Sequence, residues 1–282
     1  MRDFSQFVVE LSSEQSESGN CREVLQKAQN PILFHNITDE RTGASAPTRR
    51  WLHKMQNLSI GMNWTFISLL VMLCAYLIGS INTAIIVGRL RSDIDIREHG
   101  SGNAGMTNTM RTSGKLSGIL VLLGDVLKAV IVMTAVRVIF RGEPEYIYQY
   151  LYIAGLGAIL GHNFPIYFKF KGGKGILVSI VAIFFVSPIV GVFMLTFGLL
   201  VILISKYVSL GSMLGAISSL VFAFIFERGD MMLMAFLLIL TALTLKMHSA
   251  NIVRLINGEE NKVGKKKQES PPADTPIDNE EE

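Results

Sequence analysis

Long runs of residues without charge are the feature that most limits what this chain can fold into. Most of them are close to the roughly 20 residues with which an apolar α-helix crosses about 30 Å of hydrocarbon. Only 17% of the residues are charged, against about a quarter in typical soluble domains, and half are hydrophobic. The sequence therefore predicts an all-α integral membrane protein, with uncharged or nearly uncharged runs at 64–88, 116–140, 146–168, 175–205, 207–226 and 231–245.

The run 175–205 is too long for one upright span, and it contains Pro188 in "FVSPIVG". A proline inside a helix removes a hydrogen bond and kinks the chain, so we expect two short helices here. Dividing the run raises the expected number of transmembrane helices from six to about seven.

Lysine and arginine in the short loops indicate how these helices are oriented. The loops 89–115 and 169–174 are rich in both, whereas 141–145 carries only Arg141. Such residues prefer the cytoplasmic side of a membrane. With seven spans, the rule predicts an N-terminus outside and a cytoplasmic C-terminus.

Polar segments flank the hydrophobic body at both ends. Residues 1–61 lack sustained periodicity, and we interpret them as a disordered N-terminal extension or a misassigned start, with Met62 a natural beginning. Residues 62–260 form the expected membrane domain, and 261–282 the expected disordered cytoplasmic tail. The predicted topology places this extension outside, which conflicts with its Arg49, Arg50 and Lys54, because such residues favour the cytoplasmic side. Cys21 and Cys74 show no disulfide framework or metal-ligand spacing.

The loop "EHGSGNAGMTNTMRTSGK" at 98–115 contains the glycine spacing of a dinucleotide-binding fingerprint. That fingerprint requires a βαβ unit, which two flanking membrane spans exclude. Glycines still allow backbone N–H groups to approach an anion, and short polar side chains surround them. The loop is therefore either a phosphate cradle or an ordinary turn-rich membrane loop.

Three further polar clusters fall on the same predicted face of the membrane. "GHNFPIYFKFKGGKG" at 161–175 places lysines beside Gly172 and Gly173, but it lacks the Walker A spacing. "SKYVSLGS" at 205–212 adds Ser209. After the last span, His248, Asn251 and Arg254 recur every three residues and would share a helix face. Four such clusters on one face predict an active site between helix ends.

These segments together resemble the bacterial acyl-phosphate:glycerol-3-phosphate acyltransferases, the PlsY type. The resemblance covers residues 62–262 and rests on "AYLIGSINTAIIVGRL", "DIREHGSGNAGMTNTMR", "GDVLKA", "GHNFPIYFKFKGGKG", "SKYVSLGS" and "HSANIVRLINGEE". Asn82, Met106 and Gly211 depart from the residues usual in that family, and none of the three is expected to concern a side chain that contacts substrate.

The resemblance implies a seven-helix enzyme of phospholipid biosynthesis in the bacterial inner (plasma) membrane, with its active site facing the cytoplasm. It would transfer a fatty acyl group from acyl phosphate to the 1-hydroxyl of glycerol 3-phosphate, giving lysophosphatidic acid and phosphate. No cofactor or metal is implied, and the expected partners are these two substrates and membrane lipids, not nucleic acid.

The resemblance also assigns roles to individual residues. Ser101, Asn251 and His248 are the expected catalytic residues. The same three, with Arg111 and Lys174, are expected to bind glycerol 3-phosphate. The residues expected to bind acyl phosphate are Gly102, Asn103, Thr107, Asn108, Gly172, Gly173 and Ser209.

Several points stay open on the sequence. Either His248 or a substrate phosphate could take the proton of the attacking hydroxyl. Asp125 and Lys128, three residues apart in the second span, face one way and could neutralise each other in support of the site. A transporter of an organic phosphate is the main alternative function, and a scaffold with a basic surface at "KVGKKK" is another.

Overall fold

The computed structural model describes residues 64–263, and all regular secondary structure within that range is helical. The expected N-terminal extension and most of the expected tail lie outside the described residues. A first helical stretch covers 64–79. It is followed by α5 (Thr83–Ser92), η1 (Ile96–Glu98), α6 (Met106–Ser113), α7 (Lys115–Ile139), α8 (Ile147–Asn163), η2 (Ile166–Phe168), α9 (Ile176–Val186), α10 (Pro188–Ser205), α11 (Val208–Phe226), α12 (Met231–Met247) and α13 (Ser249–Ile256).

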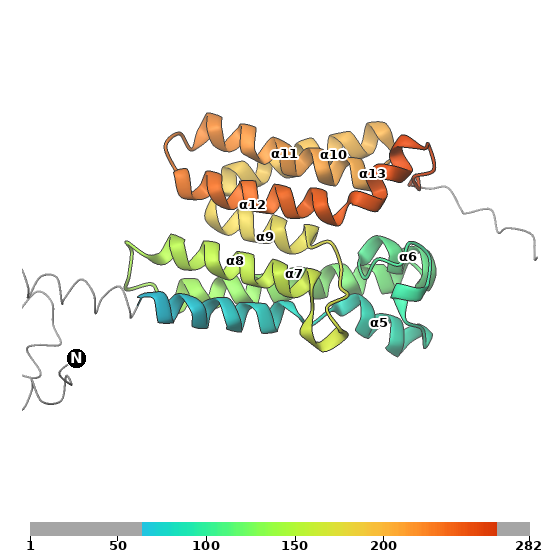
Figure 1. Ribbon diagram of the computed structural model, residues 1–282, viewed down its shortest axis with the longest axis horizontal. Helices are drawn as coiled ribbons and strands as arrows, with labels where there is room; N and C mark the ends of the chain where they lie inside the picture. The colour runs from blue at the N-terminus through green and yellow to red at the C-terminus, as the bar shows by residue number, and fades with distance from the viewer. Residues whose placement is uncertain (1–63, 264–282) are drawn as a thin grey trace, which may run out of the picture. The chain divides into compact units, whose positions relative to one another are not determined.

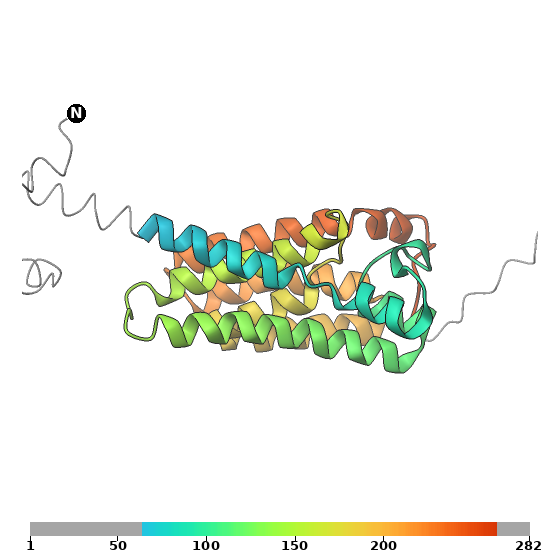
Figure 2. The same cartoon turned by 90° about the horizontal axis from the view of Figure 1, so that it is seen from below.

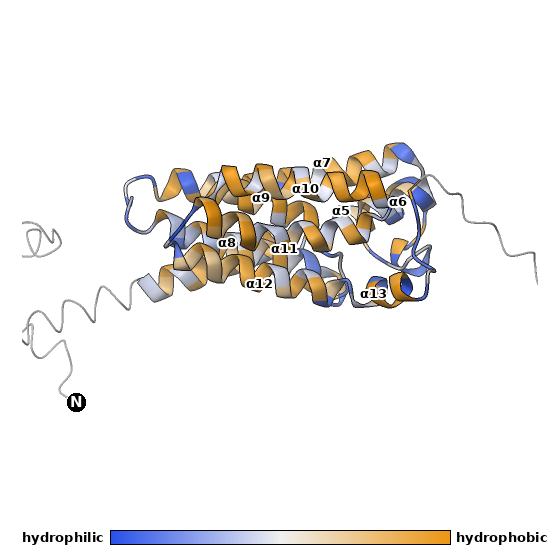
Figure 3. Cartoon of the chain, turned by 90° about the horizontal axis from the view of Figure 1, so that it is seen from above, coloured by the Kyte–Doolittle hydropathy of each residue, from blue (hydrophilic) through white to orange (hydrophobic). Residues whose placement is uncertain are grey.

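The long helices run side by side as a bundle (Figure 1). Five of them are long and apolar enough to cross a membrane, and α12 with α13, bent by 58°, makes a sixth if counted as one span. Apolar residues cover the length of the helices, whereas hydrophilic residues gather at the two ends (Figure 3). Outward-facing side chains such as Leu203, Ile204 and Phe224 are exposed, as lipid contact requires. The predicted all-α integral membrane fold is confirmed.

The predicted division of the run 175–205 is also confirmed. Helix α9 ends at Val186, and α10 begins at Pro188, which occupies the first helical position, where its missing N–H costs no hydrogen bond. Ser187 caps α10, because its Oγ accepts a hydrogen bond from the Val190 N–H. The same hydroxyl donates to Glu227 Oε1 at 2.7 Å, so this break lies beside the α11–α12 connection.

Glycines let the first helical stretch pack closely against α8. A Cβ added to Gly79 would lie 2.7 Å from Ala158 Cα, and one added to Gly161 would lie 2.8 Å from the Ser80 backbone nitrogen. Gly157 meets the backbone at Met72 in the same way. Membrane helices commonly approach through such small residues, because a bundle in lipid is stabilised by close packing.

The polar segments that the sequence singled out lie at one end of the bundle, with α5, α6 and α13 (Figures 1 and 2). We call this the site end. Arg97 Nη1 donates to the Phe168 carbonyl at 2.8 Å and thereby joins the loop after α5 to η2. The Val263 N–H donates to the Lys206 carbonyl and so joins the chain after α13 to the α10–α11 connection. The connections 140–146 and 227–230 lie at the opposite end.

Candidate active site

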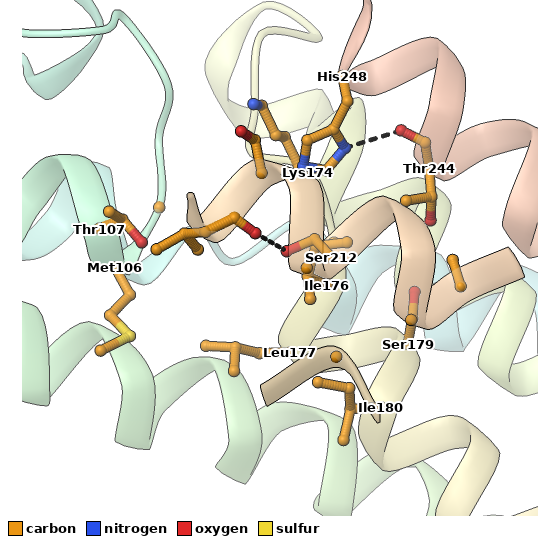
Figure 4. A pocket seen from close by; sticks show the side chains of 18 of the residues that line it. Met106, Thr107, Lys174, Ile176, Leu177, Ser179, Ile180, Ser212, Thr244 and His248 are labelled. Carbon is orange, nitrogen blue, oxygen red and sulfur yellow. Dashed lines mark hydrogen bonds between the residues drawn. The ribbon is translucent and has the colours of Figure 1, made fainter. Parts of the chain in front are cut away.

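A cavity of about 520 Å³ opens among α6, α9, α10, α11, α12 and α13 at the site end. Figure 4 shows Met106 and Thr107 of α6 on one side and Lys174, Ile176 and His248 across from them. Nine of the predicted site residues line the cavity: Ser101, Asn103, Thr107, Asn108, Arg111, Lys174, Ser209, His248 and Asn251. The predicted Gly102, Gly172 and Gly173 are not among its lining residues.

The loop before α6 is folded around one buried amide. Asn108 Oδ1 accepts from the Ser101 N–H at 2.9 Å, and Asn108 Nδ2 donates to the carbonyls of Ile96 and His99. Gly100 and Gly102 have positive φ angles of 62° and 73°, which a residue with a Cβ adopts at a cost. Asn108 therefore shapes the loop, and its hydrogen-bonding groups are already engaged.

Other side chains of this segment are free to bind a ligand. Within residues 64–263, the side chains of Ser101, Asn103, Thr107 and Arg111 line the cavity without a hydrogen-bond partner. Helix α6 begins beside them, with Gly105 as its N-cap and no side-chain cap. The first N–H groups of a helix have no partner within the helix, and the helix dipole favours negative charge there. This wall of the cavity suits a phosphate.

The glycine pair Gly172–Gly173 shapes the loop that carries Lys174. The Gly172 N–H donates to the Asn163 carbonyl, and the Gly173 N–H donates to the His162 carbonyl. A Cβ at either position would collide with the backbone or side chain of the α8 end. The pair lets the loop return tightly along α8 and carry Lys174 to the cavity, and its N–H groups are not available to a ligand in this arrangement.

The opposite wall is a connected group of polar side chains. Lys174 Nζ donates to Asn251 Oδ1, and Asn251 Nδ2 donates to Glu260 Oε1 at 2.9 Å. Glu260 also accepts from Ser209 Oγ at 3.1 Å and pairs with Arg254 at 2.9 Å. Burial lowers the pKa of Lys174 to about 8. A ligand phosphate would meet cations that are already oriented.

The sequence reasoning missed Glu260. Its position directly after the helix that carries Asn251 and Arg254, in "INGEENK", is the signal that could have indicated it. The folded chain continues past this residue, since Asn261 also lines the cavity.

His248 lies at the bend between α12 and α13 and is 2% exposed. Its Nδ1 is 2.8 Å from the Thr244 carbonyl oxygen (Figure 4). Because a carbonyl oxygen can only accept, Nδ1 carries a hydrogen, and in a neutral ring Nε2 then has the free lone pair. The expected helical continuation is bent, but Asn251 and Arg254 still share one face of α13.

Below the polar mouth, apolar side chains continue the cavity between the long helices. They include Ile180, Ile183, Met194, Leu199 and Leu240. Met106 and Gly211, two of the departures from the family pattern, line the cavity as well. The sequence alone did not show this part, because its residues look like those of any membrane span. Among residues 64–263, no group of three or more His, Cys, Asp or Glu side chains could hold a metal ion.

Comparisons with known proteins agree with the motifs. The family model described as glycerol-3-phosphate acyltransferase matches residues 69–258. The glycerol-3-phosphate acyltransferase of Thermoanaerobacter sp. (strain X514) is 40% identical over 199 residues, 71% of this chain and 97% of the relative. The protein of that name from Bacillus subtilis (strain 168) is 41% identical over 197 residues, 70% of this chain and 97% of the relative.

Two crystal structures of PlsY (YgiH), an integral membrane glycerol 3-phosphate acyltransferase, have the same fold. The glycerol 3-phosphate form has a TM-score of 0.64 and 34% identity, and covers 70% of this chain and 96% of PlsY. The lysophosphatidic acid form has a TM-score of 0.61, also at 34% identity, and covers 70% and 95%. The predicted resemblance is thus confirmed, and the chain belongs to the glycerol-3-phosphate acyltransferase family.

Proposed function

We propose that this enzyme takes its acyl group from acyl phosphate. Membership of the family makes the chain an acyltransferase that acylates glycerol 3-phosphate in membrane phospholipid synthesis. The solved relative was crystallised with glycerol 3-phosphate and with lysophosphatidic acid, and we extend both ligands to this chain as substrate and product. The identity of the acyl donor is what we propose beyond this.

One observation supports the donor proposal. The apolar part of the cavity opens directly onto two polar walls, one with cationic side chains and the other with the free N–H groups of a helix end. An acyl chain in the apolar part would place its carbonyl between Thr107 on one side and His248 on the other. A phosphate joined to that carbonyl would then lie at the beginning of α6, beside Asn103 and Thr107. Helix N-termini of this kind bind phosphate through N–H groups and the dipole.

The second phosphate, that of the acceptor, fits the cationic groups at the mouth. Arg111 has no hydrogen-bond partner among the described residues, and Lys174 is fixed by Asn251 at the opposite wall. Charge-assisted hydrogen bonds from the two residues would hold the acceptor with its 1-hydroxyl toward the acyl carbonyl. We assign Ser101, Asn251 and His248 to the same acceptor pocket and Ser209, which is bonded to Glu260, to the donor side.

The chemistry then requires no enzyme nucleophile, because the carbonyl of a mixed anhydride is already activated. The acceptor oxygen attacks the carbonyl carbon, the bond from that carbon to the phosphate oxygen breaks, and inorganic phosphate leaves. The hydroxyl proton passes to His248 Nε2 or to a phosphate oxygen of a substrate. The site supplies proximity between the substrates and hydrogen-bond donors for the negative charge that develops.

We further propose that seven helices cross the bacterial inner membrane and that the site end is cytoplasmic. Helix α9, with 11 residues and about 16 Å, is the shortest of the seven and begins two residues after Lys174. Basic residues are concentrated at the site end, whereas the connections 140–146 and 227–230 at the opposite end combine Arg141 and Arg228 with four acidic residues: Glu143, Glu145, Glu227 and Asp230. This distribution follows the positive-inside rule.

Purified enzyme incubated with labelled glycerol 3-phosphate and either palmitoyl phosphate or palmitoyl-CoA tests the donor. We expect labelled lysophosphatidic acid and an equal amount of inorganic phosphate with palmitoyl phosphate, and no product with palmitoyl-CoA. Product from palmitoyl-CoA alone would overturn the donor proposal. Product from neither would overturn the catalytic assignment of this chain.

The alternative of an organic-phosphate transporter finds no support in the site. Transporters bind substrate near the middle of the membrane. Here the polar side chains lie at one end of the bundle, and the lining below them is largely apolar.

A further inference from the structure

A buried cluster of charged and titratable side chains lies next to the cavity. Lys128 Nζ is 2.9 Å from Asp125 Oδ1, 2.8 Å from the Ile81 carbonyl oxygen and 2.9 Å from His162 Nδ1. Thr83 Oγ1 donates to Asp125 Oδ1 at 3.2 Å. The predicted neutralisation of Asp125 by Lys128 is thus visible, and His162, which no motif had singled out as a site residue, is the third member.

Burying such a cluster in a membrane helix is costly. Charged side chains within membrane spans are tolerated when they are paired and fully hydrogen-bonded, and they usually serve a function. Asp125, Lys128 and His162 are all buried, and the chemistry proposed above uses none of them. Asp125 and His162 nevertheless line the cavity, so the cluster borders the site.

His162 connects this cluster to the loop that carries Lys174. Its carbonyl accepts from the Gly173 N–H at 3.1 Å. Its ring lies so close to Gly173 that an added Cβ would collide with Nε2, and that Cβ would also be 2.5 Å from the Ala104 carbonyl oxygen of the loop before α6. The ring therefore lies against the Lys174 loop, which in turn abuts the loop before α6. Lys128 donates a hydrogen bond to the Ile81 carbonyl and so fixes the chain that leads through α5 to the loop before α6.

We propose that Asp125, Lys128 and His162 are positioning residues, which set the place of Lys174 through the His162 ring and Gly173. The charge pair on α7 holds His162 Nδ1, and the opposite edge of the ring limits where Gly173 and hence Lys174 can lie. The inference rests on the proposed role of Lys174 as a ligand of the acceptor phosphate. It predicts that changes in the cluster weaken acceptor binding although no member touches the acceptor.

The comparison of His162→Leu with His162→Asn tests this. Leucine has similar bulk but no acceptor for Lys128, whereas the amide oxygen of asparagine can take the place of Nδ1. A displacement of about 1 Å in a binding group can cost on the order of a hundredfold, so we expect His162→Leu to raise the KM for glycerol 3-phosphate roughly ten- to a hundredfold. We expect a smaller change in kcat, and His162→Asn should recover most of the loss.

A merely structural role is distinguished by a control at the opposite end of the bundle. Ser187→Ala removes a partly buried hydrogen bond to Glu227, so it should lower the melting temperature in detergent while leaving the KM unchanged. The shift in melting temperature produced by glycerol 3-phosphate should shrink in His162→Leu and stay normal in Ser187→Ala. A KM raised equally in both variants would overturn the inference, as would a His162→Asn variant no better than His162→Leu.

If His162→Leu fails to fold, Thr83→Val provides a milder change. It keeps the shape of the side chain and removes one hydrogen bond to Asp125, which should raise the KM roughly two- to tenfold. An unchanged KM would overturn the inference. Lys174→Ala separates the two proposals: an unchanged KM there overturns the role of Lys174 and the inference with it. If Lys174→Ala raises the KM but His162→Leu or Thr83→Val leaves it normal, the role of Lys174 stands and only the positioning inference is overturned.

Discussion

The proposed binding of the acceptor phosphate by Lys174 would make the site sensitive to pH. Burial lowers its pKa to about 8, so that its positive charge is lost at a pH where an exposed lysine keeps it. Below pH 8 the ammonium is present and can bind the acceptor phosphate. We expect the KM for glycerol 3-phosphate to rise above about pH 8, approaching tenfold per pH unit.

Lys174→Arg provides the matched variant for this pH profile. The guanidinium group keeps its charge to above pH 12, so the rise in KM should disappear from the measurable range even if the KM itself is higher throughout. Steady-state kinetics between pH 6.5 and about pH 9.5 would measure both enzymes. A wild-type KM that stays constant to the upper limit would contradict the prediction.

Replacement of His248 decides where the hydroxyl proton goes. If Nε2 takes the proton, His248→Ala should lower kcat roughly 10²- to 10⁴-fold with a smaller change in KM. His99→Ala is a suitable control, because the His99 side chain does not line the cavity and, among residues 64–263, bonds only to the Asp95 carbonyl. If His248→Ala alters only KM, a substrate phosphate is the base, and His248 serves as a ligand.

The identities of the side chains that line the cavity could be predicted from the sequence, but the hydrogen bonds among them could not. Short polar and basic residues clustered at helix ends indicated Ser101, Arg111, Lys174 and His248, and all four line the cavity. Two side-chain roles depend on hydrogen bonds that the pattern of residue types does not show. Asn108 is engaged in holding its loop, and Glu260 joins Ser209 to the residues of α13.

At the scale of helices and loops, length and hydrophobicity predicted the long helices well, and local hydrogen bonds decided the exceptions. Helix α6 was expected as loop, since it is eight residues of mostly Thr, Asn and Ser, which favour helix weakly. Its Thr109 and Thr112 hydroxyls bond back to carbonyls one turn earlier. The break near residue 81 was also unexpected, and there Asn82 Oδ1 accepts from the Ile85 N–H and caps α5.

The close contact of the first helical stretch with α8 gives a test at the scale of helices. Gly161→Ala would place a Cβ against the backbone near Tyr76 and Ser80, where no flexible side chain can yield. Overpacking of this kind costs about 1–3 kcal/mol, so we expect a lower melting temperature in detergent. Gly142→Ala is the control, because no atom of the described part of the chain lies within 4 Å of a Cβ at that position. Equal melting temperatures for the two variants would show that this contact adapts.

At the scale of the whole molecule, the orientation in the membrane can be measured by cysteine labelling. In a variant without Cys21 and Cys74, cysteines at Gly142 and Arg228 should react with a membrane-impermeant reagent added outside the cell. Cysteines at Asn257 and Gly258 should react only after permeabilisation. Arg228 also reports on the α9–α10 break, because Ser187 bonds to the neighbouring Glu227. Labelling of Asn257 from outside would contradict the proposed orientation.

The expected domain limits are a further prediction for the whole chain. A chain beginning at Met62 should insert and stay active, and one ending at Gly264 should be tolerated, because Val263 is bonded to Lys206 and so completes the contacts of the described chain. Loss of activity without the first 61 residues, at equal expression, would assign them a function.

The cavity joins a polar mouth at one end of the bundle to an apolar interior. This arrangement constrains how the substrates enter and how the product leaves, as well as the reaction itself. With acyl phosphate as the proposed donor, the soluble acceptor would reach the mouth from water, and the acyl chain of the donor would come from the membrane. Their product is already an amphiphile with its head at one surface and its chain among the acyl tails. It can diffuse away within a single leaflet without turning over. New phospholipid mass would therefore accumulate on the side of synthesis, and the other leaflet could grow only if separate proteins moved lipid across.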